Sequence, residues 1–281
     1  MLRRLGIPLT TVVIAVGSLL GLAGNASAAV VHHSTATAAR PNPAALHGFT
    51  PGGLIHLPTG ALHAPASGTG GATDVESTNW SGYAATGADG AFSSVSSSWT
   101  QPTASCTSRR GDTYAAFWVG LDGYSSDTVE QTGTLIECVG RTAYYYGWYE
   151  MYPAALTLYS NTVKPGDAMS ASVTFSGTET YTLVLTDTTQ DWSETFTANE
   201  SGLDRSSAEV ITEAPSSSSG VLPLADFGTV TYGASLVNGS SLAAASSLAD
   251  ITMVDNSGLD KDTTGSIASN GSFSNTWVRS S

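Results

Sequence analysis

The sequence predicts an all-β domain in which short antiparallel strands form a sandwich or a barrel. Downstream of residue 75, short runs alternate between polar and apolar residues, and turn signals separate these runs. No stretch shows a convincing helical period, and no repeat recurs at a fixed spacing. Roughly 200 residues with this pattern are typical of one antiparallel domain with a single core.

Alternation assigns one side of each predicted strand to the core. Met169–Phe175 reads Met-Ser-Ala-Ser-Val-Thr-Phe, so its odd-numbered residues form an apolar face. Further strands are predicted at Tyr181–Leu185, Trp192–Thr197, Ala208–Thr212, Gly228–Tyr232, Ile251–Val254 and Phe273–Val278. Turn signals occur at Lys164–Asp167, Asn238-Gly239 and Asn270-Gly271, and one short helical turn fits within Ser241–Leu248.

The first 28 residues have the pattern of a secretory signal peptide. Arg3 and Arg4 precede an apolar stretch, and Ala26-Ser27-Ala28 supplies the small residues of a cleavage site. The alternative, a membrane anchor, is disfavoured because the apolar stretch is short and interrupted by glycines. We therefore expect residues 1–28 to be removed and the protein to be secreted, with no membrane partner.

Residues 29–73 differ in composition from the rest of the chain. They are rich in Ala, Pro, Gly, Thr and His and contain neither Asp nor Glu, whereas all six tryptophans lie further downstream. Such a segment cannot build a core alone, so it is either a propeptide or a disordered leader. We expect residues 29–73 to be a propeptide and linker that binds the folded domain, residues 74–281.

The domain from Asp74 onward is strongly acidic. It holds all 23 acidic residues of the chain and seven basic ones, a formal charge of about −16. Such a surface repels nucleic acid and anionic membranes, so neither is expected as a partner. With few basic residues, protonation of the carboxylates leaves little positive charge, and charge repulsion in acid should be weak.

All five histidines lie before residue 64, which leaves the folded domain without an imidazole. Ser-His-Asp and Cys-His catalysis and the usual zinc sites are therefore excluded, and we expect no metal and no cofactor. The histidines are either scattered by chance or charge on acidification and weaken the grip of the leader on the acidic domain. The two cysteines, Cys106 and Cys138, are expected to form one disulfide in an exported protein.

Elimination leaves carboxylates, amides and hydroxyls as the candidate catalytic groups. The chain has no Gly-x-Ser-x-Gly, no Asp-Thr-Gly or Asp-Ser-Gly, no His-Glu-x-x-His and no phosphate-binding loop. The acidic run Asp255–Asp262 could bind calcium weakly, but a solvated loop is the favoured interpretation.

Eight short motifs follow one another along nearly the whole domain. They are Ser77–Gly82, Trp99 close to Pro102, Phe117–Gly123, Gln131–Gly133, Trp148–Pro153, Pro165–Asp167, Ser207–Glu213 and Leu222–Gly228. In this order they resemble the glutamic peptidases, also called eqolisins, a family of fungal acid peptidases with bacterial relatives. The resemblance runs from about Glu76 to Ser281; each motif alone is weak, and the ordered set is specific.

The resemblance implies a concanavalin A-like, jelly-roll sandwich of two antiparallel sheets with the active site on its concave face. It assigns the catalytic glutamine to Gln131 and the catalytic glutamate to Glu209. Residues that bind substrate or support the pair map to Trp80, Trp118, Asp122, Trp148 and Glu150. Two positions depart from the fungal pattern: Leu135 replaces an acidic residue four places after the glutamine, and Val210 replaces a tryptophan.

A glutamate and a glutamine suit peptide hydrolysis in acid. One carboxyl group can take a proton from water and return it to the leaving amine if its pKa lies near the working pH. A carboxamide does not titrate, so it can donate a hydrogen bond to the oxyanion at any pH. The sequence thus predicts a secreted, monomeric acid endopeptidase, made as a zymogen, that cuts polypeptide substrates with Glu209 and Gln131.

Alternatives remain for these residues. Glu130 must face the side of the sheet opposite to Gln131, so a register error of one residue would exchange them. Glu213 is a rival to Glu209 on the same strand face, and Asp122 is followed by glycine as turn residues often are. A glycoside hydrolase or lectin would suit paired carboxylates, although residues four apart on a strand are separated by about 13 Å. A surface adhesion domain would suit the Ser/Thr richness.

Overall fold

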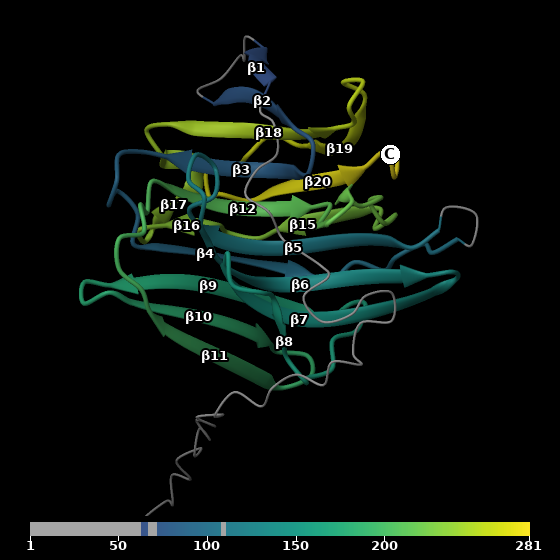
Figure 1. Ribbon diagram of the computed structural model, residues 1–281, viewed down its shortest axis with the longest axis horizontal. Coiled ribbons are helices and arrows are strands. Elements are labelled where there is room, and N and C mark those ends of the chain that lie inside the picture. Colours follow the sequence, from purple (N-terminus) through teal and green to yellow (C-terminus); the bar gives the residue numbers. More distant parts are fainter. Residues whose placement is uncertain (1–62, 67–71, 108–110) are drawn as a thin grey trace, which may run out of the picture. The chain divides into compact units, whose positions relative to one another are not determined.

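A computed structural model describes residues 63–66, 72–107 and 111–281 of the chain (Figure 1). These residues all belong to one unit, Ala36–Ser281. The predicted signal peptide and most of the predicted propeptide lie outside the described residues. So do four of the five histidines, and only the backbone of His63 is described. Among the described residues, no helix is long and apolar enough to span a membrane.

The predicted all-β class is confirmed, and two layers of strands form the domain. The first sheet runs in the order β1 (His63–Ala66), β2 (Thr73–Ser77), β18 (Leu248–Val254), β3 (Trp80–Thr86), β12 (Ser207–Glu213), β5 (Thr113–Leu121), β6 (Val129–Val139), β7 (Thr142–Tyr152) and β8 (Thr157–Leu158). All its pairings are antiparallel except β2 with β18. Figure 1 shows these strands stacked from β2 down to β7.

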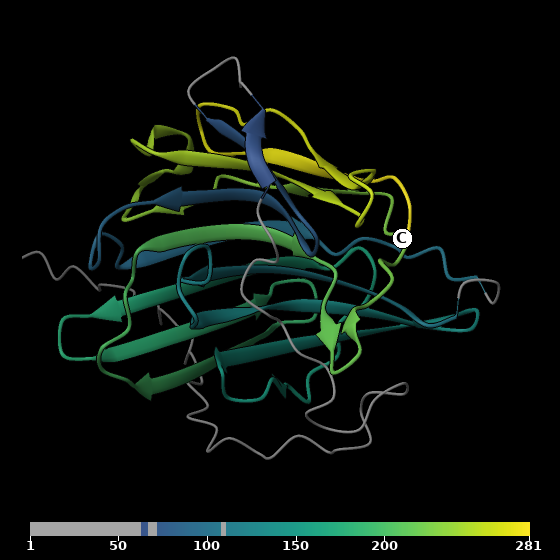
Figure 2. The same cartoon turned by 45° about the horizontal axis from the view of Figure 1, so that its top comes forward.

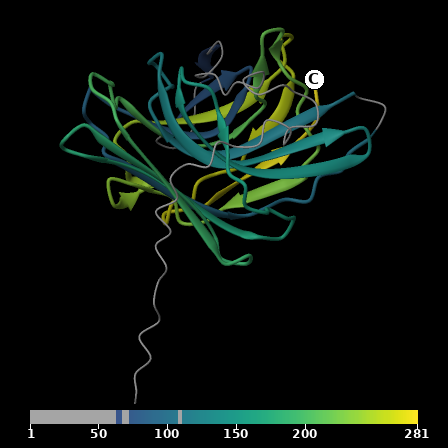
Figure 3. The same cartoon turned by 60° about the horizontal axis from the view of Figure 1, so that its bottom comes forward.

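The second sheet lies against one face of the first. Its order is β11 (Trp192–Asn199), β10 (Thr180–Asp187), β9 (Ala168–Ser176), β4 (Ser94–Thr100), β15 (Thr229–Tyr232), β20 (Phe273–Trp277) and β19 (Asp260–Thr264). The hairpin β16 (Leu236–Val237) and β17 (Ser240–Ser241) also pairs with β4. Pairing of β18 with β19 joins the two sheets at one side, and the strands are bowed (Figure 3).

A short hairpin stands apart from both sheets. It consists of β13 (Ser216–Ser217) and β14 (Gly220–Val221), and Figure 2 shows it in light green beyond the end of β12. A 3-10 turn, η1 (Leu242–Ala244), falls within the segment where one helical turn was predicted.

The main core lies between the two sheets. In β10, Tyr181, Leu183 and Leu185 are buried and the residues between them are half-exposed, which is the alternation that the sequence predicted. Aromatic rings from the two sheets meet edge to face in this core, among them Tyr83 and Phe273 with centroids 4.8 Å apart. Edge-to-face contacts add to the stabilisation from burial of the rings.

The first sheet is apolar on its other face as well. A second cluster of buried side chains covers that face: Val75, Trp80, Ala84, Tyr114, Ala116, Trp118, Val129, Leu135, Trp148, Leu158, Ile211, Ala249 and Ile251. Every residue of β5 and of β12 is therefore buried. A strand buried on both faces reads as a continuous run rather than an alternation. This accounts for the absence of β5 and β6 from the predicted strands, although Ala208–Thr212 on the equally buried β12 was predicted.

The second sheet differs, because its outer face carries hydroxyl groups. Ser96, Ser98, Ser170, Ser172 and Thr186 are half-exposed or exposed, and they lie side by side on β4, β9 and β10. Small polar β-formers are expected on the wet face of an antiparallel sheet. This face accounts for part of the Ser/Thr richness that had suggested an adhesion domain.

The predicted turns form as expected. Asn238 and Gly239 join β16 to β17 with φ angles of 50° and 77°, the left-handed conformations that a two-residue hairpin loop requires. The predicted strands are all present, most of them one to three residues longer than the sequence pattern indicated.

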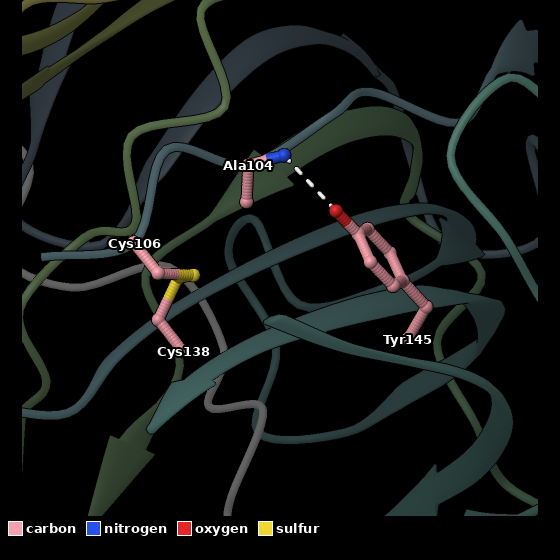
Figure 4. Close-up of a disulfide and its surroundings, with 4 residues drawn as sticks. All are labelled: Ala104, Cys106, Cys138 and Tyr145. Atoms are coloured by element: carbon pink, nitrogen blue, oxygen red, sulfur yellow. Dashed lines mark hydrogen bonds between the residues drawn. A yellow bond between two sulfur atoms is a disulfide. The ribbon is translucent and has the colours of Figure 1, made fainter. Parts of the chain in front are cut away.

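The predicted disulfide between Cys106 and Cys138 is confirmed, with a Cα–Cα distance of 5.4 Å. It ties the segment after β4 to the end of β6, and the Ala104 amide donates a hydrogen bond to the Tyr145 hydroxyl nearby, 3.0 Å away (Figure 4). These contacts fix the loop that precedes β5.

Removal of this disulfide should lower stability while leaving the fold intact. We expect the Cys106→Ser, Cys138→Ser double variant to lose about 3 kcal/mol of unfolding free energy, because the unfolded chain gains the freedom of a loop of about thirty residues. Denaturant titration at pH 4 would measure the change. A loss below about 1 kcal/mol would contradict the expectation.

Candidate active site

The two residues assigned as the catalytic pair lie on the same face of the first sheet and at the same level. Gly120 in β5 is directly opposite Gln131 in β6 and directly opposite Glu209 in β12. The backbones of Gln131 and Glu209 are thus two strand spacings apart, about 10 Å. Gly120 bears no side chain of its own between the two long ones. We name the row of Gln131, Gly120 and Glu209 the dyad row.

The three predicted tryptophans share this face. Trp118 and Trp148 lie on the next row along the strands, on either side of Gly133. Trp80 lies one row further and packs edge-on against Trp118, with centroids 4.9 Å apart. All three indoles are buried, so the dyad row has an apolar, aromatic border.

Glu150 orients the glutamine. It lies directly opposite Gln131 on β7, and the Gln131 Nε2 donates a hydrogen bond to Glu150 Oε2 at 2.8 Å. Leu135, where the fungal pattern has an acid, lies two rows away opposite Ala116. The acceptor that orients the amide is therefore supplied across the ladder from β7, not from four residues later on β6.

Asp122 supports the site through the backbone. It follows the end of β5 with a φ of 68°, and its carboxylate accepts hydrogen bonds from the amides of Arg205, 2.6 Å, and Ser206, 2.8 Å. These two residues immediately precede β12. Asp122 is thus both a turn residue and the anchor that fixes where the strand with Glu209 begins.

Burial raises the pKa of the Glu209 carboxyl well above its ordinary value. The Ser207 hydroxyl acts in the opposite direction, and the carboxylates of Asp122 and Glu130 raise the pKa further. Within the part of the chain that the structure describes, Glu209 has no ion-pair partner. The buried Glu209 thus favours its protonated form.

Burial also raises the pKa of Glu150, with a further contribution from the charge of Glu213. The Gln131 amide and the Leu156 backbone amide partly oppose this shift. Gln131 therefore lies between two carboxyl groups, Glu150 and Glu209, that both tend to be neutral in the buried site.

Glu130 faces the other side of the sheet, as strand alternation predicted. It lies toward the core between the sheets, where burial, followed by the charge of Asp122, raises its pKa to about 9. The Arg205 side chain acts on it in the opposite direction. Gln131, and not its neighbour, is the residue that belongs to the dyad row.

The acidic run Asp255–Asp262 was expected to be a solvated loop, but only its first part is a turn: Asp260 and Asp262 belong to β19, and Asp262 is buried. Asp255 accepts hydrogen bonds from the amides of Ser257 and Leu259 and forms an ion pair with Arg279 at 3.1 Å. Among the described residues, no three His, Cys, Asp or Glu side chains are grouped so that they could hold a metal ion.

Sequence reasoning missed two contributors to the site. Gly120 is the shared neighbour of the dyad residues, and the sequence held no signal of that pairing. Glu213 was considered only as a rival to Glu209, yet its Oε2 accepts a hydrogen bond from the Trp118 Nε1 at 2.9 Å. Glu213 was visible as the last residue of the Ser207–Glu213 motif, but its partner on β5 was not.

The domain is an antiparallel sandwich in which a buried glutamate and a buried glutamine lie in one row, on a face that also carries three tryptophans. This combination is the one expected of a glutamic peptidase. Residues 78–277 match the model of the Peptidase A4 family, and the chain belongs to that family. It is 31% identical over 178 residues to Aspergillopepsin-2 of Aspergillus niger, a match that covers 56% of this chain and 62% of that relative. The chain thus spans less than two thirds of the length of this relative.

Solved structures of glutamic peptidases are similar to this chain. Scytalido-glutamic peptidase with a transition state analog inhibitor matches with a TM-score of 0.61 and 27% identity, over 72% of this chain and 98% of that one. SCP-B, an eqolisin in complex with the tripeptide Ala-Ile-His, matches with a TM-score of 0.58 and 26% identity, over the same shares, 72% and 98%. Aspergilloglutamic peptidase from Aspergillus niger matches with a TM-score of 0.52 and 26% identity, over 59% and 99%.

The family assignment overrides the glycoside hydrolase, lectin and adhesion alternatives. It also confirms the resemblance that the ordered motifs indicated and the sandwich fold that the resemblance implied.

Buried carboxyl groups should make the fold most stable in acid. Burial raises the pKa of Glu130 to about 9, of Asp262 to about 7 and of Asp250 to about 6. Their values in an unfolded chain are near 4, so the stability is complete below about pH 4 and is lost as the pH rises through 6 to 9. Lys261, whose pKa burial lowers to about 8, acts in the opposite sense only around and above that pH.

We expect the unfolding free energy to fall continuously between pH 4 and pH 9, as measured by denaturant titration. Glu130→Gln should reduce this fall, because a carboxamide cannot ionise, whereas Glu200→Gln on the exposed surface should not. Stability that rises toward neutral pH, or equal slopes for both variants, would contradict the argument.

Proposed function

We propose that this protein is an acid endopeptidase that hydrolyses peptide bonds in polypeptide substrates with Glu209 and Gln131. The observation that carries the proposal is the pairing of both residues with Gly120, which places Glu209 and Gln131 at the same level on one face of the sheet, with a residue that has no side chain between them. Membership of the Peptidase A4 family supports the same reaction class.

In the proposed mechanism, the Glu209 carboxylate removes a proton from a water molecule held between Glu209 and Gln131. The water oxygen forms a bond to the carbonyl carbon of the substrate, and the carbonyl oxygen becomes an oxyanion. Glu209, now protonated, gives its proton to the amide nitrogen, and the carbon–nitrogen bond breaks to release a carboxylic acid and an amine. One carboxyl group thus serves first as base and then as acid.

Gln131 stabilises the oxyanion in this mechanism. A carboxamide nitrogen carries two hydrogens, and the bond to Glu150 uses one of them. That bond fixes the plane of the amide, and we assign the other hydrogen to the oxyanion. Because the donor is fixed before the reaction, little reorganisation is needed in the transition state.

The working form of the site must admit water. Burial is the largest cause of the raised pKa of Glu209, so entry of water would lower that pKa toward its ordinary value. The carboxylate form is then available in acid, which is the condition that the base requires.

We also propose that the protein is made as a zymogen and secreted as a monomer. The sequence of residues 1–28 and the composition of residues 29–73 support this proposal. Strand β1 belongs to the predicted propeptide segment and pairs with β2, with His63 opposite Glu76. Removal of the segment would thus take one edge strand from the first sheet.

The role of Glu209 can be tested by Glu209→Gln, which keeps the shape and removes the titrating group. We expect hydrolysis of denatured casein at pH 3–4 to be abolished while the fold persists by circular dichroism. Glu200→Gln is the matched surface control, and the assay contains pepstatin and a chelator. Retention of more than about a tenth of the activity would refute the assignment, since base catalysis contributes about 100-fold or more.

The role of Gln131 can be tested by Gln131→Met, which preserves the volume and removes the donor. We expect kcat to fall about 100- to 1,000-fold, the usual cost of losing an oxyanion donor. KM should change little, because the donor acts mainly in the transition state. A kcat within about fivefold of wild type would exclude an oxyanion role for this amide.

A further inference from the structure

Gly120 has a second neighbour besides the catalytic pair. A Cβ atom at this position would lie 3.3 Å from the Gln131 Cβ and 2.8 Å from Cζ3 of Trp118. The Trp118 indole therefore leans over Gly120, into the level of the dyad row. A distance of 2.8 Å between carbons is well inside contact range, so the ring can occupy this place only because residue 120 is glycine.

The opposite edge of the same indole is held by Glu213. Nε1 of Trp118 donates to Glu213 Oε2 at 2.9 Å, and both residues are fully buried. Trp80 lies opposite Glu213 in the ladder and packs its ring against Trp118 at an interplanar angle of 76°. The indole is thus fixed by a hydrogen bond at its pyrrole edge and by the space over Gly120 at its benzene edge.

We propose that Gly120 and Glu213 are positioning residues that act through Trp118. Gly120 admits the benzene edge of the indole between Glu209 and Gln131, and Glu213 fixes the rotation of the ring. Trp118 then forms the apolar floor that determines where the attacking water and the scissile carbonyl can lie. This inference rests on the proposed function, because it assigns roles around the same pair.

The geometry gives Glu213 a task that does not require ionisation. It is four residues from Glu209 on the same strand, about 13 Å along the backbone, and its Oε2 is engaged by the indole. What Trp118 requires at this place is an acceptor oxygen, which a carboxamide supplies as well as a carboxylate. The structure therefore separates the acceptor function of Glu213 from the proton transfer assigned to Glu209.

The decisive comparison is between Glu213→Leu and Glu213→Gln, with Glu209→Gln assayed beside them. Leu removes the acceptor, so we expect kcat to fall at least about tenfold while KM stays within about twofold. Gln restores the acceptor and should recover kcat to within about fivefold of wild type. A purely structural effect would change the melting temperature without this split between kcat and KM.

Each outcome decides between the assignments. If Glu213→Gln is as inactive as Glu209→Gln, then Glu213 transfers a proton and the inference is wrong. If Glu213→Leu has wild-type kcat, Trp118 needs no anchor and the inference is also wrong. If Glu209→Gln itself keeps its activity, the proposed function fails, which is a separate result.

A second pair of variants keeps the test informative if Glu213→Leu does not fold. Phenylalanine at position 118 has no indole N–H. In the Trp118→Phe variant, the additional substitution Glu213→Gln should therefore not change kcat further. Gly120→Ala should lower kcat about 100-fold, because the added methyl group displaces the Trp118 ring. Trp118→Phe should restore the folding of Gly120→Ala but not its activity, because the phenyl ring has no N–H for Glu213 to hold. Wild-type kcat for folded Gly120→Ala would overturn the inference.

Discussion

The register of β12 and β6 on either side of β5 is the constraint on which the site depends. A slip of one residue in either ladder would turn Glu209 or Gln131 to the other face of the sheet. Asp122 fixes the register of β12, because its carboxylate accepts hydrogen bonds from the two backbone amides immediately before that strand. The disulfide holds the C-terminal end of β6 in place by joining Cys138 to Cys106 in the segment before β5. The positions of Glu209 and Gln131 thus depend on contacts made outside the pair itself.

The same sheet explains why the domain suits acid. It is apolar on both faces, so the acids placed on it, Glu130, Glu150 and Glu209, are buried and have raised pKa values. In acid these groups are neutral and cost little to bury; toward neutral pH each must either ionise in an apolar surrounding or hold its proton. Burial of these carboxyl groups therefore accounts for the expected stability of the scaffold in acid, whereas the proposed base requires water in the site to reverse the same effect on Glu209.

Sequence reasoning predicted β9 and β10, each of which has one face exposed to solvent. Met169–Phe175 and Tyr181–Leu185 alternate because the second sheet has a solvated, hydroxyl-rich face, and both strands were predicted. The strands β5 and β6 were missed, because burial on both faces hides the period of two; β7, which is half-buried along most of its length, was missed as well. Within the site, alternation separated Glu130 from Gln131, but the contacts of Gly120 and Glu213 depend on pairing between strands far apart in sequence, which one sequence does not encode visibly.

The strand β12 carries two glutamates whose surroundings divide their tasks. Glu213 meets an indole N–H, a donor that interacts with its oxygen in any protonation state, whereas Glu209 meets mainly apolar burial and neighbouring negative charge. A carboxyl group held by a fixed donor is suited to positioning, and one whose proton affinity changes with solvation is suited to proton transfer. On this argument the tryptophan and the glycine of β5 do more than line the site, because they keep the two glutamates in separate environments on one face.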